Sequence, residues 1–163
     1  GSEMCIRDSF STCGFLKELG RMKGMPKMMV GLTSSSSAET LKGCPKQAEG
    51  MIIPTSFAPI TPAAKEVAAL AAANGGAADL HSAAAWENVM IIKDVIEAVG
   101  ITGDPSKVKE ERAKIRDGLE ALKTTEGLIG TVTRVQDEGE ALKPFVFVHA
   151  KNGSWEVLHD PRN

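Results

Sequence analysis

Short apolar runs alternate with polar loops over residues 27–62, and this alternation organises the first part of the chain. Residues 28–32 and 51–55 are apolar runs of the kind typical of parallel strands covered on both faces. Between them lie a serine-rich loop and a short helical pattern over 38–42, for which Ser37 is a candidate N-cap. We therefore expect strand, loop, helix and strand in this order, with small ligands bound beyond the carboxyl ends of the strands.

Helical periodicity marks residues 10–22 and dominates the segment after residue 60. Thr61 followed by Pro62 predicts a helix that runs to residue 73, because Thr is a good N-cap and Pro is favoured in the first turn. A longer helix is expected over 82–99, with Trp86 in the core, and a third begins at 104–105. The charged run over 107–117 indicates the solvated face of that third helix.

The last third of the chain changes to a β pattern. Strands are expected over 131–135, 145–148 and 155–158, with turns at 137–140 and 151–154. Asn152-Gly153 is a strong signal for a two-residue hairpin turn. At the other end, residues 1–9 begin with Gly-Ser and read as a non-native leader, so we exclude them from the fold and expect no signal peptide to be visible.

Composition and motifs exclude several classes of function. The net charge of −2 does not favour a nucleic-acid partner, and no apolar run approaches the roughly 18 residues of a membrane span. Three irregularly spaced cysteines predict neither a disulfide framework nor a zinc site, leave at least one thiol free and do not decide the compartment. The three histidines lack ligand spacing, and no phosphate-binding, dinucleotide-binding or nucleophile motif is present. We therefore expect no metal, no cofactor and no enzymatic activity.

Four sequence words, taken in order, resemble the C-terminal part of branched-chain amino-acid-type solute-binding proteins, the type I periplasmic binding proteins of ABC importers. They are AEGMII at 48–53, AAAWENV at 83–89, RAKIRDGL at 112–119 and EGLIGTV at 126–132. In the second word Trp86 replaces the usual Tyr, and Glu87-Asn88 replaces the usual Asp-Ala. The resemblance covers roughly residues 15–158.

The resemblance implies an α/β, partial type I periplasmic-binding-protein fold, within a two-lobed protein about twice this length. Residues 10–55 would form the end of the C-terminal lobe, and 56–128 a hinge crossing with helices of the N-terminal lobe. Residues 129–163 would supply the closing strands and hairpins. The strands of the first lobe would be absent, so we expect exposed apolar surface on the helices over 63–122 and poor stability of this chain alone.

The function implied is that of an extracytoplasmic, periplasmic or lipid-anchored receptor. It would bind a small polar solute (an amino acid, amide or related carboxylate) between its lobes, close, and deliver it to an inner-membrane ABC permease. Two alternatives stay open. One is a ligand-sensing regulator of the same fold, and the other is an α/β enzyme whose catalytic half is missing.

Candidate ligand contacts follow the predicted strands. Thr33, Ser34 and Ser35 come directly after the first strand, and Thr33 stands where amino-acid-binding members carry an acid. A neutral hydroxyl cannot offset a buried ammonium, so either another group holds that charge or the ligand is not a plain amino acid. Phe57 is a candidate contact or a packing residue, and His81 is a candidate near a helix N-terminus or a surface histidine. The alternative for the serine loop is a turn that only caps a helix.

Overall fold

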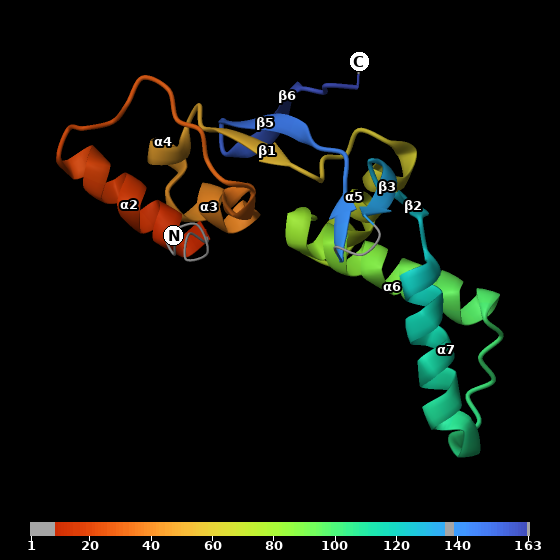
Figure 1. Cartoon of the computed structure of the whole chain (residues 1–163). Helices are drawn as coiled ribbons and strands as arrows, with labels where there is room; N and C mark the ends of the chain where they lie inside the picture. The colour runs from red at the N-terminus through yellow and green to blue at the C-terminus, as the bar shows by residue number, and fades with distance from the viewer. Residues whose placement is uncertain (1–8, 136–138, 163) are drawn as a thin grey trace.

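The computed structural model describes residues 9–135 and 139–162, and its elements form two groups at opposite ends of the molecule (Figure 1). The first group contains α2 (Ser9–Arg21), η1 (Thr33–Ser35), α3 (Ala38–Gly43), α4 (Pro45–Ala48), β1 (Ile52–Thr55), β5 (Val146–Lys151) and β6 (Ser154–His159). The second contains α5 (Pro62–Ala73), α6 (Leu80–Ala98), η2 (Pro105–Lys107), α7 (Val108–Ala121), β2 (Thr124–Gly127), β3 (Gly130–Val135) and β4 (Glu140–Leu142). The proposed leader lies outside the described residues except for Ser9, which begins α2. Residues 137 and 138 of the predicted turn at 137–140 also lie outside them.

The first group is built on a three-stranded sheet with the order β1-β5-β6, and both pairings are antiparallel. Ile53 lies opposite Val148, and Ala150 lies opposite Trp155. Asn152 and Gly153 take φ values of 51° and 76°, as the left-handed turn between β5 and β6 requires. The predicted Asn-Gly hairpin is confirmed.

The predicted strand at 28–32 is only partly present. Val30 forms a single parallel bridge with Ile52, through a hydrogen bond from Gly31 N–H to the Ile52 carbonyl at 2.8 Å and one from Ile52 N–H to the Met29 carbonyl at 2.9 Å. Met28 and Val30 are 71% and 70% exposed. The predicted parallel pairing is present, but the prediction of a full strand covered on both faces was wrong. Among the described residues, β1 pairs with one edge of the segment, and Met28 and Val30 stay exposed.

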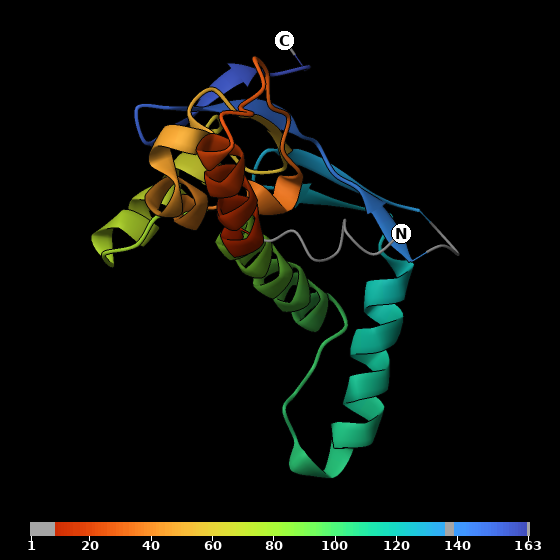
Figure 2. The same cartoon turned by 90° about the vertical axis from the view of Figure 1, so that its left-hand side faces the viewer.

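Helices α2, α3 and α4 pack beneath this sheet, with α2 crossing close to α3 (Figure 2). The buried cluster there contains Leu16, Leu41, Cys44, Met51, Ile53, Val146 and Val148, among others. Cys13 and Cys44 form a disulfide across this contact. The spacing of the cysteines did not predict this bond, because the two residues lie 31 positions apart and only the crossing of α2 over α3 brings them together.

The second group has its own core of Phe57, Ala64, Val67, Ala83, Leu128 and Ile129. Thr61 is the N-cap of α5, as predicted, and accepts a hydrogen bond from Ala64 N–H at 3.1 Å while its hydroxyl donates to the Leu128 carbonyl. The buried Glu87 carboxylate accepts from Leu128 N–H at 2.6 Å and from the Lys143 ammonium. These contacts fasten α5 and α6 to the β2–β3 turn.

Helix α6 exposes large apolar side chains. Trp86 is 42% exposed and Val89 is 65% exposed, whereas the buried side chains of α6 are Ala83, Glu87 and Val95. The assignment of Trp86 to the core was therefore wrong, because no described element covers this face of α6. The expectation of exposed apolar surface on these helices is confirmed.

Helices α6 and α7 cross closely at Gly118, where a β-carbon would lie 2.7 Å from a methyl group of Val95. The connection between them is held by Glu111, which is 6% exposed. Its Oε1 accepts from the Thr102 N–H and hydroxyl at 2.8 and 2.6 Å, and its Oε2 accepts from Gly103 N–H at 3.1 Å. The hydrogen bonds from Thr102 lower the pKa of the Glu111 carboxyl below its ordinary value. Within the described residues, every helix falls short of the length and apolarity that a bilayer crossing requires.

Replacing Cys13 and Cys44 by Ser should lower the free energy of unfolding by about 3–4 kcal/mol, because the disulfide restricts a loop of this length in the unfolded chain. Urea unfolding followed by circular dichroism measures the change. Dithiothreitol should destabilise the wild-type chain and leave the double variant unaffected. A wild-type transition that does not move with reductant would contradict the role given to this cross-link.

Glu111→Gln should remove part of the acid sensitivity of folding. Because the folded-state pKa of Glu111 is lowered, its stabilisation is present above the unfolded-state pKa of about 4.3 and is lost as the pH falls through the folded-state pKa. Urea midpoints at pH 7 and pH 3 should therefore differ less for the variant than for the wild type. Glu120→Gln, an equal charge change at an exposed position of α7, is the control and should keep the wild-type pH dependence.

Candidate functional site

The serine-rich loop is a tight turn. Thr33–Ser35 form η1, and the Thr33 carbonyl accepts from Ser36 N–H at 3.1 Å and from the Ser36 hydroxyl at 2.8 Å. Ser37 is the N-cap residue of α3, as predicted, although its side chain makes no capping hydrogen bond. The loop is therefore an ordered connection between the 28–32 segment and α3.

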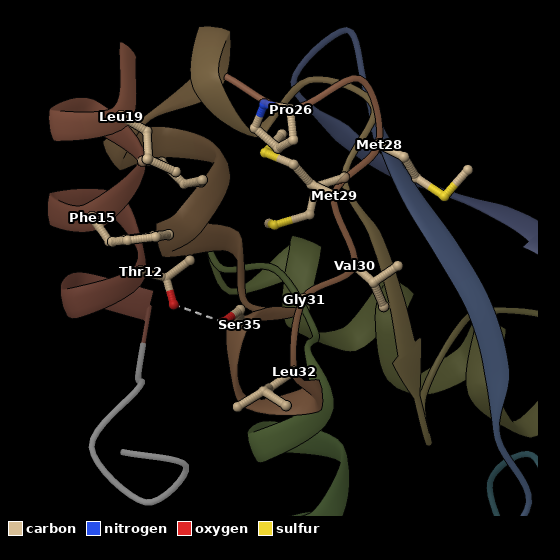
Figure 3. A pocket seen from close by; sticks show the side chains of 12 residues that line it. Thr12, Phe15, Leu19, Pro26, Met28, Met29, Val30, Gly31, Leu32 and Ser35 are labelled. Atoms are coloured by element: carbon tan, nitrogen blue, oxygen red, sulfur yellow. Dashed lines mark hydrogen bonds between the residues drawn. The ribbon is translucent and has the colours of Figure 1, made fainter. Parts of the chain in front are cut away.

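Ser35 and Ser36 hold this turn to its neighbours. Ser35 is 2% exposed, and its hydroxyl lies 2.8 Å from that of Thr12 on α2 (Figure 3). The Ser36 hydroxyl lies 3.2 Å from the hydroxyl of Thr55, at the end of β1. Ser36 and Thr55 were not among the predicted site residues, although both are hydroxyl side chains that follow or end a predicted strand.

A hollow of about 300 Å³, called here the central hollow, opens beyond the carboxyl end of β1. The first group of elements contributes Ser36 and Thr55 at one side, and the chain leaving β1 contributes the buried ring of Phe57. Asp79 and Leu80, at the start of α6, line the opposite side. The central hollow thus gathers hydroxyl, aromatic and carboxylate side chains from segments far apart in sequence.

Hydrogen bonds hold two lining residues of the central hollow, Trp155 and Asp79, in place. Trp155 on β6 lines it and donates its indole N–H to the Ser37 carbonyl at 3.1 Å. Asp79 caps α6, where its Oδ1 accepts from Ser82 N–H at 2.9 Å and the Ser82 hydroxyl donates to the same oxygen. Because Asp79 already occupies the N-terminus of α6, this helix end does not favour an anion.

The predicted contacts are not gathered in one cavity. Phe57 lines the central hollow and also belongs to the second core, so its packing role is confirmed. His81 is exposed and lines a separate hollow of about 600 Å³ beside Lys17 and Glu39. Ser35 lines a third, apolar hollow of about 430 Å³ between α2 and the 28–32 segment. Thr33 and Ser34 are half-buried on η1 and line none of these three.

The chemistry of the central hollow suits a small polar molecule. Hydroxyls both donate and accept hydrogen bonds, an aromatic ring provides an apolar wall, and a carboxylate attracts a cation. Within residues 9–135 and 139–162, no three histidine, cysteine, aspartate or glutamate side chains lie together as a metal site. The described side chains therefore offer recognition by hydrogen bonding and packing.

Comparison with known proteins gives both a sequence family and a fold. The profile of the family described as periplasmic binding protein matches residues 7–154. A search of curated sequences finds no matching protein.

Several solved structures share the fold. A leucine-binding protein from Thermotoga maritima is 20% identical with a TM-score of 0.74, and the match covers 95% of this chain and 43% of that one. A branched-chain amino acid transporter substrate-binding protein from Streptococcus pneumoniae, in complex with isoleucine, is 17% identical with a TM-score of 0.72, with coverage of 94% and 43%. An ABC transporter substrate-binding protein from Desulfitobacterium hafniense, in complex with leucine, is 21% identical with a TM-score of 0.64, with coverage of 89% and 39%. The chain thus spans less than half the length of these proteins.

Ser36→Ala should destabilise the chain by about 1–2 kcal/mol, because the buried Ser36 hydroxyl joins the Thr33 carbonyl to the Thr55 hydroxyl. Thr33→Ala is the matched control and should cost less than half as much, since no described residue bonds to the Thr33 hydroxyl. Urea unfolding of both variants measures the difference. Equal losses would show that Ser36 does not connect the turn to β1.

Proposed function

Because the chain belongs to the periplasmic binding protein family, we propose that it is part of the solute-binding component of an ABC importer. In this proposal the protein works outside the cytoplasm, binds a small polar solute and delivers it to an inner-membrane permease. The observation that carries the proposal is the central hollow, which combines Ser36 and Thr55 from one group of elements with Asp79 from the other. A site shared by two groups of elements is what a protein that closes around a ligand requires.

The ligand class that we propose is an amino acid, an amide or a related carboxylate. Two of the structures that share the fold carry isoleucine or leucine. The hydroxyls of Ser36 and Thr55 suit a carboxylate or amide group, and Phe57 suits an apolar side chain. Thr33 cannot pair with a ligand ammonium, and the Asp79 carboxylate is the acidic group that lines the central hollow. Asp79 is therefore our candidate for an ammonium contact.

Closure would take place between the two groups of elements. The chain leaves the first group after β1, at residues 56–61, and returns to it before β5, at residues 143–145. We propose that these two crossings are the hinge, with residues 10–55 in one lobe and the helices of 56–128 in the other. Ligand in the central hollow would contact both lobes only when they are closed, and so would shift the population toward the closed state.

We expect Thr55→Val, in a full-length receptor that carries this chain, to weaken solute binding about fivefold. The reason is that Thr55 lines the central hollow, where its hydroxyl would bond to the solute, and a buried hydrogen bond to a ligand contributes about a kcal/mol. Calorimetry with L-leucine, L-isoleucine and acetamide measures the affinity. Thr124→Ala, at an exposed position of β2, is the control and should bind like the wild type. Unchanged affinity of Thr55→Val would remove the Thr55 hydroxyl from the site.

A further inference from the structure

A second polar hollow, called here the α6 hollow, lies within the second group of elements. It has a volume of about 250 Å³ and lies between α6 and one face of the sheet formed by β2, β3 and β4. Its described lining residues do not overlap with those of the central hollow. The lining includes Glu87, Asn88 and Ile91 from α6 and Thr125, Val132 and Arg134 from the sheet.

The alternation of side chains along the strands places Arg134 on the face of the sheet that looks toward α6. Arg134 lies opposite Ala141 of β4, and both residues line the α6 hollow. Val132 lies two positions before Arg134 and therefore shares this face. Glu126 and Glu140 lie one position away from lining residues, so their side chains belong to the other face. The sheet thus turns a cation, and no strand carboxylate among the described residues, toward the hollow.

The Arg134 guanidinium is an unused recognition group. It is half-buried, and within residues 9–135 and 139–162 no side chain or carbonyl accepts a hydrogen bond from it. The Arg134 backbone N–H donates to the Lys123 carbonyl at 2.8 Å, so the position of the strand is fixed. A guanidinium carries five N–H donors in a planar fork that matches a carboxylate group. An anionic ligand in the hollow would satisfy these donors.

The carboxylate that lines the α6 hollow, that of Glu87, is already neutralised. Its Oε1 accepts from Leu128 N–H at 2.6 Å, and its Oε2 accepts from the Lys143 ammonium. Lys143 also lines the hollow, and its ammonium has further N–H donors for a ligand. The described lining therefore carries two cations and one carboxylate, and this balance favours an anion.

The remaining lining decides which kind of anion fits. Ile91 and Val132 form an apolar wall, and the hydroxyl of Thr125 adds a polar group. A volume of about 250 Å³ is below the range of roughly 300–1,000 Å³ that is typical of pockets for drug-sized ligands. The α6 hollow therefore suits a small molecule with one anionic end and a short apolar chain.

We propose that the α6 hollow binds a short aliphatic carboxylate. The carboxylate group would be held by the Arg134 guanidinium and the Lys143 ammonium, and the alkyl chain would pack on Ile91 and Val132. This site is separate from the central hollow and goes beyond the solute binding proposed above, on which it does not depend. Inorganic phosphate has the charge but lacks the alkyl chain, so it should bind more weakly than the carboxylate.

Isothermal titration calorimetry of the chain with sodium n-butyrate tests the proposal. Arg134→Gln should weaken butyrate binding about tenfold or more, because it removes the charge and the planar fork of donors. Arg112→Gln, the same substitution at an exposed position of α7, is the matched control and should bind like the wild type. n-Butylamine has the same alkyl chain and the opposite charge, so it should bind about tenfold more weakly than n-butyrate.

Ala141→Leu keeps the test decisive if Arg134→Gln does not fold. It leaves every charge in place and adds bulk opposite Arg134, at an exposed position of the edge strand β4, so it should also block butyrate. A wild-type chain that binds no butyrate, or that binds n-butylamine equally well, would overturn the proposal. Wild-type affinity in Arg134→Gln or Ala141→Leu would do the same. So would a loss of butyrate binding in Thr55→Val alone, which would assign the carboxylate to the central hollow.

Discussion

Strand β1 makes hydrogen bonds on both of its edges, and the architecture of the first group depends on them. On one edge Ile52 joins the 28–32 segment in parallel, and on the other β1 pairs with β5 over four positions. Residues from the beginning, middle and end of the chain are thereby held in one sheet. The central hollow lies at the end of β1, because its lining includes Thr55, the last residue of that strand, and Phe57, two residues further on.

The second group is held by different means. Two polar side chains, the half-buried Thr61 and the buried Glu87, both bond to the backbone of Leu128. Each satisfies a backbone group that burial would otherwise leave unpaired, at a cost of about 1–3 kcal/mol. These contacts fix the start of α6, and therefore Asp79, relative to the β2–β3 turn. One wall of the central hollow thus depends on β1 and the opposite wall on Leu128.

Local signals in the sequence predicted the features that depend only on neighbouring residues, such as helix starts and tight turns. Thr61-Pro62 located the start of α5, and Asn152-Gly153 located the β5–β6 turn, because a cap and a two-residue turn depend only on adjacent residues. The sequence did not predict burial and strand pairing correctly where these depend on residues distant in sequence. The periodicity of α6 could not show that no described element covers Trp86. Nor could the apolar run at 28–32 show that, among the described residues, this segment pairs along one edge only. The residues of the candidate site were likewise predicted only in part. Hydroxyls after a strand were found at Thr33–Ser35, whereas the contact of Ser36 with Thr55 arises only from tertiary packing.

The disulfide between Cys13 and Cys44 means that the first group of elements can complete its folding only where thiols are oxidised. Protein thiols stay reduced in an ordinary cytosol and oxidise beyond it. In the exported protein that we propose, α2 would be held to α3 only by packing before export, and the chain would remain easier to unfold for passage through a membrane. The Cys13–Cys44 disulfide would form after that passage. The first group of elements would therefore finish folding only once the protein is in an oxidising compartment.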